Sequence, residues 1–141
     1  MQVPYYIFRL PARENHSFGH LVEYLEENLS QCVTYFPWLT AELLDGVGPR
    51  QTIEFINQFG SLRIRVEQIE REIDAGEKTI NNINRLASDC GFLEVQSASG
   101  FVKDLRKFCV RRLIDLGEDP KLIAQMTGVS IRSIQRYKKS V

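Results

Sequence analysis

Apolar residues recur every three or four positions along most of this chain, a spacing that predicts a mainly helical protein. The clearest case begins at Ser17 and continues to about Leu29, where apolar side chains share one side and glutamates the other. Glycines follow several of these stretches, as expected where helices end. Helices are expected over residues 17–29, 40–45, 50–58, 67–86 and 101–116, followed by two short helices near the end of the sequence.

Residues 61–66, Ser-Leu-Arg-Ile-Arg-Val, form the clearest strand pattern because apolar and polar residues alternate strictly. A single strand leaves its backbone groups without partners. Two partners are considered for it. One is the segment 3–10, which is rich in strand formers and bounded by prolines; the other is the same strand of a second subunit across a two-fold axis.

The helical stretch after the strand carries a thin isoleucine seam, interrupted at Gly76, on an otherwise charged surface. Such a helix packs either on its own domain or against a symmetry mate, and the pattern leaves both open. If the second holds, a homodimer would use the apolar side of the strand and the beginning of the seam. These residues are Leu62, Ile64, Val66, Ile69 and Ile73.

Charge divides the chain into two parts although its formal net charge is zero. Residues 1–100 carry eight Lys/Arg and fourteen Asp/Glu, a net charge of −6, whereas residues 101–141 carry ten and four, a net charge of +6. A small polar stretch, Gln-Ser-Ala-Ser-Gly, lies at the transition. We therefore predict an acidic helical domain over 1–95, a linker over 96–100 and a basic domain over 101–141.

The basic part ends in two short helices joined by a tight turn. Asp119 is a natural N-cap, and Pro120 is suited to the first helical position. Gly128 provides the positive φ that a sharp turn needs, and Ser130 is a suitable cap for the second helix. Together with the helix over 101–116, this layout is typical of a three-helix helix-turn-helix domain whose last helix enters the major groove of DNA.

The outward residues of the last helix are cations, amides and hydroxyls, the groups that read bases and contact phosphates. We expect Arg132, Gln135 and Arg136 to read base edges, and Ser130 and Lys139 to position the helix on phosphates. The complete predicted DNA-binding set is Ser130, Arg132, Ser133, Gln135, Arg136, Lys138, Lys139, Lys121, Lys103, Arg106 and Lys107.

Patterns that would indicate catalysis or metal binding are weak in this sequence. His16 and His20 lack a second paired cluster of zinc ligands, and Gly46-Val47-Gly48 lacks the Lys-Ser/Thr of a phosphate-binding loop. No nucleophile has an adjacent histidine to activate it. We therefore expect no enzymatic activity, no cofactor and no metal.

The location of the protein is also suggested by what the sequence contains. We recognise no secretory signal and no apolar run long enough to cross a bilayer. The three cysteines, Cys32, Cys90 and Cys109, are odd in number and widely spaced, as expected for reduced thiols. A cytoplasmic protein that does not contact membranes is expected.

An aromatic cluster, Tyr35-Phe36-Pro37-Trp38, interrupts the helical pattern. Its rings have the flat apolar faces needed to stack on a ligand. Aromatic side chains also dominate small cores, so packing where two helices meet is the favoured interpretation.

Residues 48–60, Gly-Pro-Arg-Gln-Thr-Ile-Glu-Phe-Ile-Asn-Gln-Phe-Gly, followed by the alternating strand, resemble the Mor transcription activators of Mu-like phages. The resemblance covers about 48–66 and 111–139 and includes the C-terminal helix pair. Two departures lie in and before the strand. Ser61 replaces the family's second glycine, and Arg63-Ile64-Arg65 stands where the family tends to have an aromatic-Ile-Pro run.

The resemblance implies a homodimer whose strands pair across the two-fold axis, with two DNA-binding domains held at a promoter. It also implies contact with RNA polymerase. The matching positions are Phe59 and Gly60 at the hinge, Leu62, Ile64 and Val66 in the strand, and Ser130, Arg132, Gln135 and Arg136 on the recognition helix.

These observations together predict a mainly α protein. We expect an N-terminal helical domain with one or two short strands and a C-terminal three-helix helix-turn-helix domain. The expected function is that of a homodimeric, sequence-specific DNA-binding transcription regulator, activator-like and of phage or mobile-element type. Two alternatives use the same helical domain: a protein-interaction adaptor, and an accessory subunit of a recombinase or terminase.

Overall fold

The structure, a computed structural model, describes Pro11 and residues 16–87 and 92–139. The described chain is mainly helical with one small two-stranded sheet, which confirms the predicted fold class at this level. The segment 3–10, expected to be extended, lies outside the described residues. In chain order the elements are α1 (His16–Glu27), α2 (Leu29–Cys32), the 3-10 helix η1 (Val33–Tyr35), α3 (Trp38–Val47), α4 (Pro49–Phe59), β1 (Arg63–Ile64), α5 (Val66–Glu72), α6 (Gly76–Leu86), β2 (Leu93–Glu94), α7 (Ala98–Asp115), α8 (Pro120–Thr127) and α9 (Ile131–Lys139).

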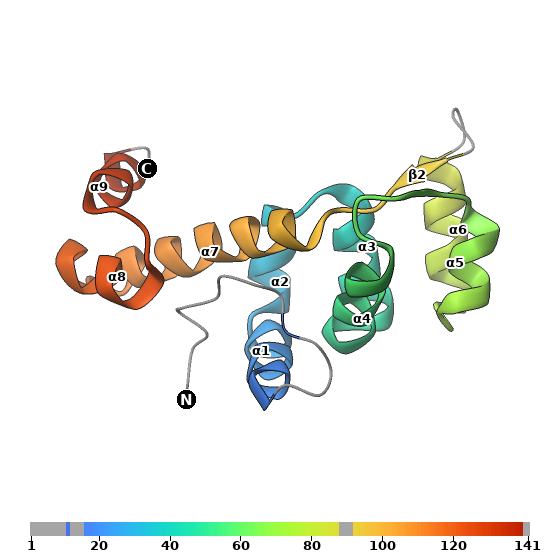
Figure 1. Ribbon diagram of the computed structural model, residues 1–141, viewed down its shortest axis with the longest axis horizontal. Helices are drawn as coiled ribbons and strands as arrows, with labels where there is room; N and C mark the ends of the chain where they lie inside the picture. The colour runs from blue at the N-terminus through green and yellow to red at the C-terminus, as the bar shows by residue number, and fades with distance from the viewer. Residues whose placement is uncertain (1–10, 12–15, 88–91, 140–141) are drawn as a thin grey trace.

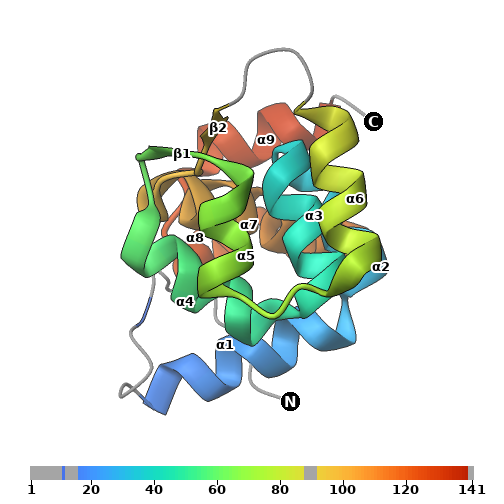
Figure 2. The ribbon, with the colours of Figure 1, turned by 90° about the vertical axis from the view of Figure 1, so that its right-hand side faces the viewer.

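Helix α7 runs along the long axis of the molecule from the α8–α9 end to the middle, and β2 with the residues after it leads from the other end to the beginning of α7 (Figure 1). Helices α8 and α9 lie at one end, and α5, α6 and the small sheet lie at the other, with α1 to α4 between them (Figure 1). Seen from the α5–α6 end, α8 and α9 lie behind the rest of the molecule (Figure 2). The molecule is therefore elongated, with α7 as its central helix.

The main hydrophobic core is built by α1 to α6 and the two strands and is completed by α7 residues from Phe101 to Cys109. The ring of Phe36 stacks on Phe101 with centroids 4.6 Å apart, and Tyr35 meets Phe108 edge-on at 5.5 Å. Burying a ring such as Phe101 contributes roughly 1.5–3 kcal/mol by removing it from water. Core packing is thus confirmed for Tyr35 and Phe36, whereas Trp38 is 44% exposed.

A second, smaller hydrophobic cluster joins the last part of α7, from Val110 onward, to the α8–α9 pair. Its buried members are Val110, Leu113, Ile123 and Ile134. The first two belong to α7, so this helix supplies side chains to both clusters. The two hydrophobic clusters are therefore connected by a continuous helix.

Residues 96–100, the predicted linker, lie at the beginning of α7. The hydroxyl of Ser97 accepts a hydrogen bond from the Gly100 N–H at 3.0 Å and caps the helix, so the three residues after it form the first helical turn. The Gln96 side chain accepts a hydrogen bond from Thr40 of α3 at 2.9 Å. Small polar residues are common both in loops and at helix N-caps. Composition alone therefore did not distinguish the beginning of α7 from a linker.

Strand β1 pairs antiparallel with β2, with Arg63 opposite Glu94 and Ile64 opposite Leu93. The observed strand is shorter than the predicted 61–66, and within the described residues its partner is β2, which the sequence had not suggested. The α5–α6 pair returns the chain to the side of β1. This is a long-range effect that local alternation of residues does not reveal.

The residues expected at a dimer seam lie mostly inside the chain. Ile64, Val66, Ile69 and Ile73 are at most 9% exposed and belong to the main core, whereas Leu62 is 51% exposed. Two helices, α5 and α6, replace the single interrupted helix and contact each other. The chain turns between them, so the isoleucines make their apolar contacts within one chain.

Helices α3 and α6 cross closely at Gly46. A Cβ atom added to this glycine would collide with the side chain of Thr79, including its Cβ at 2.9 Å, which a change of rotamer cannot relieve. Thr79 itself is 7% exposed and has little space into which it can move. The absence of a side chain at Gly46 is therefore a requirement of the crossing.

Gly46→Ala is expected to lower the free energy of unfolding by about 1–2 kcal/mol, because overpacking costs more than the gain in helix propensity returns. Urea denaturation followed by circular dichroism measures the change. The matched control is Gly19→Ala in α1, where an added Cβ meets no atom within 4 Å. This control should be stabilising by up to about 1 kcal/mol, and equal effects of the two substitutions would contradict the close crossing.

Candidate nucleic-acid interface

Helix α8 begins and ends as the residue types at its termini predict. The carboxylate of Asp119 accepts a hydrogen bond from the Lys121 N–H at 2.9 Å, and Pro120 occupies the first helical turn. Gly128 adopts a left-handed conformation with φ of 74°, and its N–H donates to the Ala124 carbonyl at 2.9 Å. These contacts confirm the predicted N-cap and the predicted glycine turn.

The turn between α8 and α9 is stabilised by side-chain hydroxyls. Ser130 accepts a hydrogen bond from the Ser133 N–H at 3.2 Å, which confirms it as the cap of α9. Thr127 is fully buried; its hydroxyl donates to the Ile123 carbonyl at 2.8 Å and accepts from the Val129 N–H at 3.2 Å. The sequence did not reveal this role for Thr127, although threonine before a glycine turn is suited to it.

Burial in the α7–α9 cluster agrees only in part with the expected inward positions. Ile123 and Ile134 are fully buried, as their helical spacing indicates. Leu116 ends the stretch 101–116 that was expected to be helical and is 65% exposed, because α7 ends at Asp115 and the chain turns away. Ile131 lies three residues before Ile134, a spacing that favours the inner side of the helix, but it is 41% exposed at the beginning of α9.

The outward face of α9 is lined by polar and positively charged side chains. Arg132, Gln135, Arg136 and Lys139 are all exposed, and their spacing of three and four residues places them on one side of the helix. Lys138 is also exposed, and residues 131–139 contain no acidic side chain. The helix therefore presents a continuous basic stripe with an amide within it.

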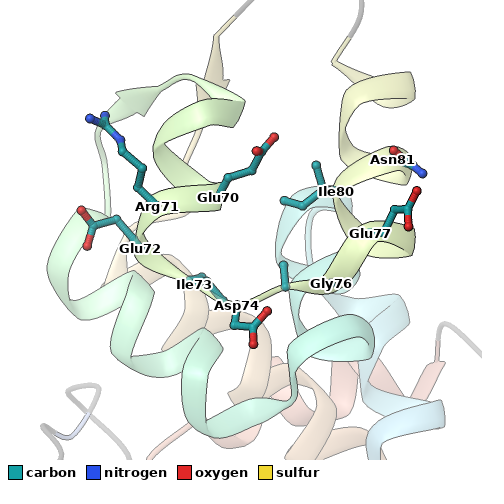
Figure 3. A pocket seen from close by; sticks show the side chains of 10 residues that line it. Glu70, Arg71, Glu72, Ile73, Asp74, Gly76, Glu77, Ile80 and Asn81 are labelled. Carbon is teal, nitrogen blue, oxygen red and sulfur yellow. The ribbon is translucent and has the colours of Figure 1, made fainter.

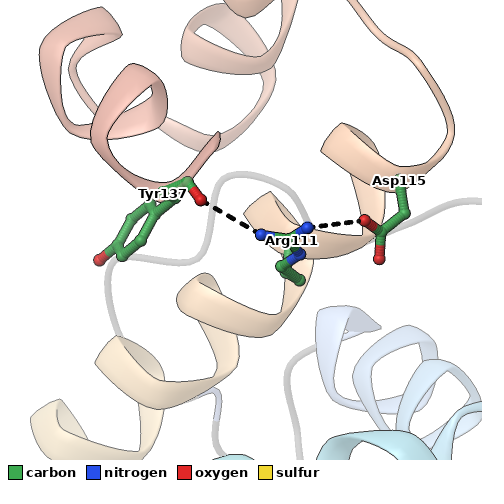
Figure 4. Close-up of polar contacts among 3 residues, drawn as sticks. All are labelled: Arg111, Asp115 and Tyr137. Carbon is green, nitrogen blue, oxygen red and sulfur yellow. Dashed lines mark hydrogen bonds and ion pairs between the residues drawn. The ribbon is translucent and has the colours of Figure 1, made fainter. Parts of the chain in front are cut away.

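Arg111 of α7 holds the C-terminal end of α9. Its Nη1 donates to the backbone carbonyl of Tyr137 at 3.2 Å, and its Nη2 pairs with Asp115 at 3.1 Å (Figure 4). Tyr137 lies in the last turn of α9, where the backbone carbonyls carry partial negative charge and lack helical partners. Arg111 therefore acts within the domain, a role that its basic character alone did not reveal.

The predicted phosphate contacts on α7 differ in their surroundings. Lys103 and Lys107 are exposed, whereas Arg106 is half-buried and interacts within the chain. Lys107 precedes Arg111 by one helical turn, about 6 Å along the axis, and lies on the same side of α7. Helical spacing therefore places Lys107 and Lys103 on the Arg111 side of α7, one and two turns toward the N-terminus of the helix.

The remaining predicted residues are distributed over the helix pair. Lys121 is exposed in the first turn of α8. Ser130 and Ser133 belong to the cap of α9, and their hydroxyls lie 3.0 Å apart. Ser133 is half-buried, so its hydroxyl is less accessible than the side chains of the basic stripe.

Two buried thiols lie away from this surface. Burial raises the pKa of Cys32 and of Cys109 to about 11, and the Cys109 thiol lies 3.7 Å from the Tyr24 hydroxyl. Both thiols are therefore protonated near neutral pH, and a protonated buried thiol is a poor nucleophile.

An open groove of about 610 Å³ lies between α5 and α6. Glu70 and Ile80 point into the space between the helices, while Arg71 and Glu77 point away from it (Figure 3). Because the side chains of Glu70 and Glu77 point in different directions (Figure 3), their carboxylates cannot act together on one reacting atom or metal ion. Across residues 16–87 and 92–139, no group of three or more His, Cys, Asp or Glu side chains is placed to hold a metal ion.

Among the helices that the structure describes, none combines the length and apolar character needed to cross a membrane. Comparisons with protein-family models, with curated proteins and with solved structures found no match to this chain. The resemblance to the Mor activators therefore stays a prediction, and the functional proposal rests on the geometry of α8 and α9.

Arg111→Ala is expected to loosen the last turns of α9, because the Tyr137 carbonyl loses a charged donor. The local stability should fall by about 1 kcal/mol, a modest value because the Arg111–Asp115 pair is partly exposed to water. Hydrogen exchange of the α9 amides measures this. Arg112→Ala is the matched control, since its Nη1 donates to Gln31 of α2 at 3.2 Å and should leave exchange in α9 unchanged.

Proposed function

We propose that this protein binds double-stranded DNA by placing α9 in the major groove, and that it reads sequence there as a transcription regulator. The exposed stripe of Arg132, Gln135, Arg136 and Lys139 is the observation that supports this proposal most. A helix held on two others by a glycine turn, with such a stripe outward, has the shape and chemistry that a major groove accommodates.

The members of the stripe have different proposed roles. The Arg132 and Arg136 side chains have planar guanidinium groups that pair with two acceptors of guanine, and the Gln135 amide pairs with adenine. Lys139 lies at the C-terminal end of the helix and would contact phosphate, which fixes position without reading sequence. Arg111 contributes indirectly by holding the C-terminal end of α9 on α7.

Electrostatics supports a polyanionic partner for this end of the molecule. Exposed Lys107 extends the positive surface from α9 onto α7, while the acidic residues of the chain are concentrated before residue 100. Long-range attraction would orient the protein with α9 toward DNA and its acidic part away from it. The zero net charge of the whole chain does not oppose this arrangement, because binding depends on the local field.

Arg132→Ala and Arg136→Ala are each expected to weaken binding to the preferred site by about 1–3 kcal/mol and to relax preference at one base position. Lys139→Ala should instead weaken all sequences alike and reduce the slope of log affinity against log salt by about 0.9. Fluorescence anisotropy over a salt series, with DNA selected from a random pool, measures both effects. Lys78→Ala, an exposed lysine on α6, is the matched control.

Absence of salt dependence, or equal behaviour of the Lys78 and Lys139 variants, would contradict DNA binding through α9. Charge reversal at Arg132, Arg136 and Lys139 distinguishes DNA binding from the main alternative, a protein-interaction adaptor. If a protein partner is still bound by that variant, the helix pair is an interaction adaptor. An accessory role in recombination or packaging would require DNA binding with no effect on transcription from a promoter that contains the selected site.

We further propose that two copies act together at a promoter, with contact to RNA polymerase, as the resemblance to the Mor activators implies. The burial of Ile64, Ile69 and their neighbours means that such a homodimer would use other surfaces. Leu62, half-exposed beside β1, is the only member of the predicted set that a second copy could reach directly.

A homodimer predicts a selected DNA site with two related halves whose centres are about 34 Å apart, one turn of the double helix. Light scattering of the protein with and without this DNA measures the number of copies. A single asymmetric half-site bound by one copy would contradict the homodimer while leaving DNA reading by α9 intact.

A further inference from the structure

The side chain of Trp38 remains outside the core that its neighbours fill. It is 44% exposed at the beginning of α3, although Tyr35 and Phe36 just before it pack against α7. Two grooves, of about 430 and 460 Å³, border the indole, and Trp38 and Glu94 line both. The aromatic cluster of the sequence is therefore divided between the core and the surface.

The outer face of the small sheet lies beside this tryptophan. Arg63 is opposite Glu94 in the strand register, so Arg65 falls opposite Phe92 just before β2. The Arg63 and Arg65 guanidinium carbons lie 5.9 and 4.9 Å from the centre of the Phe92 ring, which is 42% exposed. The two arginines are exposed, and their stems are kept in place by the ring beneath them.

Trp38, Phe92, Arg63, Arg65 and Glu94 together form what we call the Trp38 surface. Exposed aromatic rings rimmed by charged groups commonly mark protein interaction sites. Tryptophan and arginine are also the residue types most often found at the energetic centre of such interfaces. A purely structural role would explain the arginines over Phe92, but it does not explain the exposure of Trp38 between two grooves.

We propose that the Trp38 surface binds a short acidic segment of a partner protein. Its apolar or aromatic side chain inserts beside Trp38, and its carboxylates pair with Arg63 and Arg65. Charge complementarity favours this occupant, because the two arginines present planar donor groups that match carboxylates in an otherwise acidic part of the chain. Glu94 faces the same grooves and accepts hydrogen bonds from the donors of the segment.

The position of this surface goes beyond the proposed DNA binding. The small sheet and α9 lie near opposite ends of α7, whose eighteen residues span about 27 Å (Figure 1). A partner segment on the Trp38 surface would therefore leave α9 accessible. The two activities can be tested independently of each other.

A library of short random peptides, displayed and selected on the immobilised full-length protein, tests the proposal. We expect enriched peptides to carry an aromatic or aliphatic residue flanked by aspartate or glutamate. Their affinity should fall about tenfold or more for Trp38→Ala and for the double variant Arg63→Glu, Arg65→Glu. It should fall similarly when the acids of the peptide are replaced by amides.

The matched control is the double variant Arg71→Glu, Arg85→Glu, which makes the same charge change at exposed positions of α5 and α6. It should bind the selected peptides as the parent does. If Trp38→Ala reduces thermal stability, the test rests on the variant Arg63→Glu, Arg65→Glu. Both arginine side chains are exposed, so their replacement should leave the fold intact.

Three outcomes would overturn the proposal. One is selection of no peptide, or of peptides whose binding is unaffected by the Trp38 and arginine variants. Another is loss of DNA affinity in the arginine variant with a reduced salt slope, which would assign the surface to DNA. The last is a halved mass for Trp38→Ala in light scattering, which would assign it to a second copy. Failure of DNA binding by α9 would leave the peptide result unchanged.

Discussion

Removal of one side of α7 from water along its whole length is the interaction on which both ends of the molecule depend. Phe101 and Leu105 complete the core of α1 to α6, and two turns later Val110 and Leu113 support α8 and α9. Burial of apolar surface has no directional requirement. One helix can therefore pack in two separate hydrophobic clusters, provided that apolar residues face each cluster along the corresponding part of the helix. A continuous helix also transmits orientation, which a flexible linker of the same length would not.

The proposed reading helix depends on this arrangement more than on its own sequence. With nine residues, α9 is too short to be stable alone in water. Its one fully buried side chain, Ile134, anchors it in the small cluster, and partly buried Tyr137 packs against the same cluster. Arg111 adds a polar contact at the end of the helix farthest from the glycine turn. An apolar contact in the middle and polar contacts at both ends fix the direction in which the basic stripe faces.

Features that depend on nearby residues were predictable from the sequence. Asp119, Gly128 and Ser130 act through hydrogen bonds or backbone angles within four positions, so their residue types were sufficient evidence for the helix pair. The identities and spacing of the α9 side chains likewise predicted most of the exposed ones. The exceptions are Ile131, which is exposed at the helix end, and Ser133, which is half-buried.

Features that depend on distant residues were not predictable. The pairing of β1 with β2 joins positions about thirty residues apart, and no periodicity records it. The isoleucine seam was correctly identified as apolar, but a periodic pattern does not say whether the partner is the same chain or another. For the same reason, Arg111 could not be distinguished from the cations of α9, because charge alone does not show that a backbone carbonyl lies within reach.

The position of α7 late in the chain has a consequence for biosynthesis. Chains emerge from the ribosome N-terminus first, so α1 to α6 are made before the helix that covers Phe36 and Tyr24 exists. The apolar surface that α7 covers stays exposed until α7 has been synthesised, and during that interval it is the surface that a chaperone would bind. Helices α8 and α9 emerge after α7 and can pack on it once it is anchored.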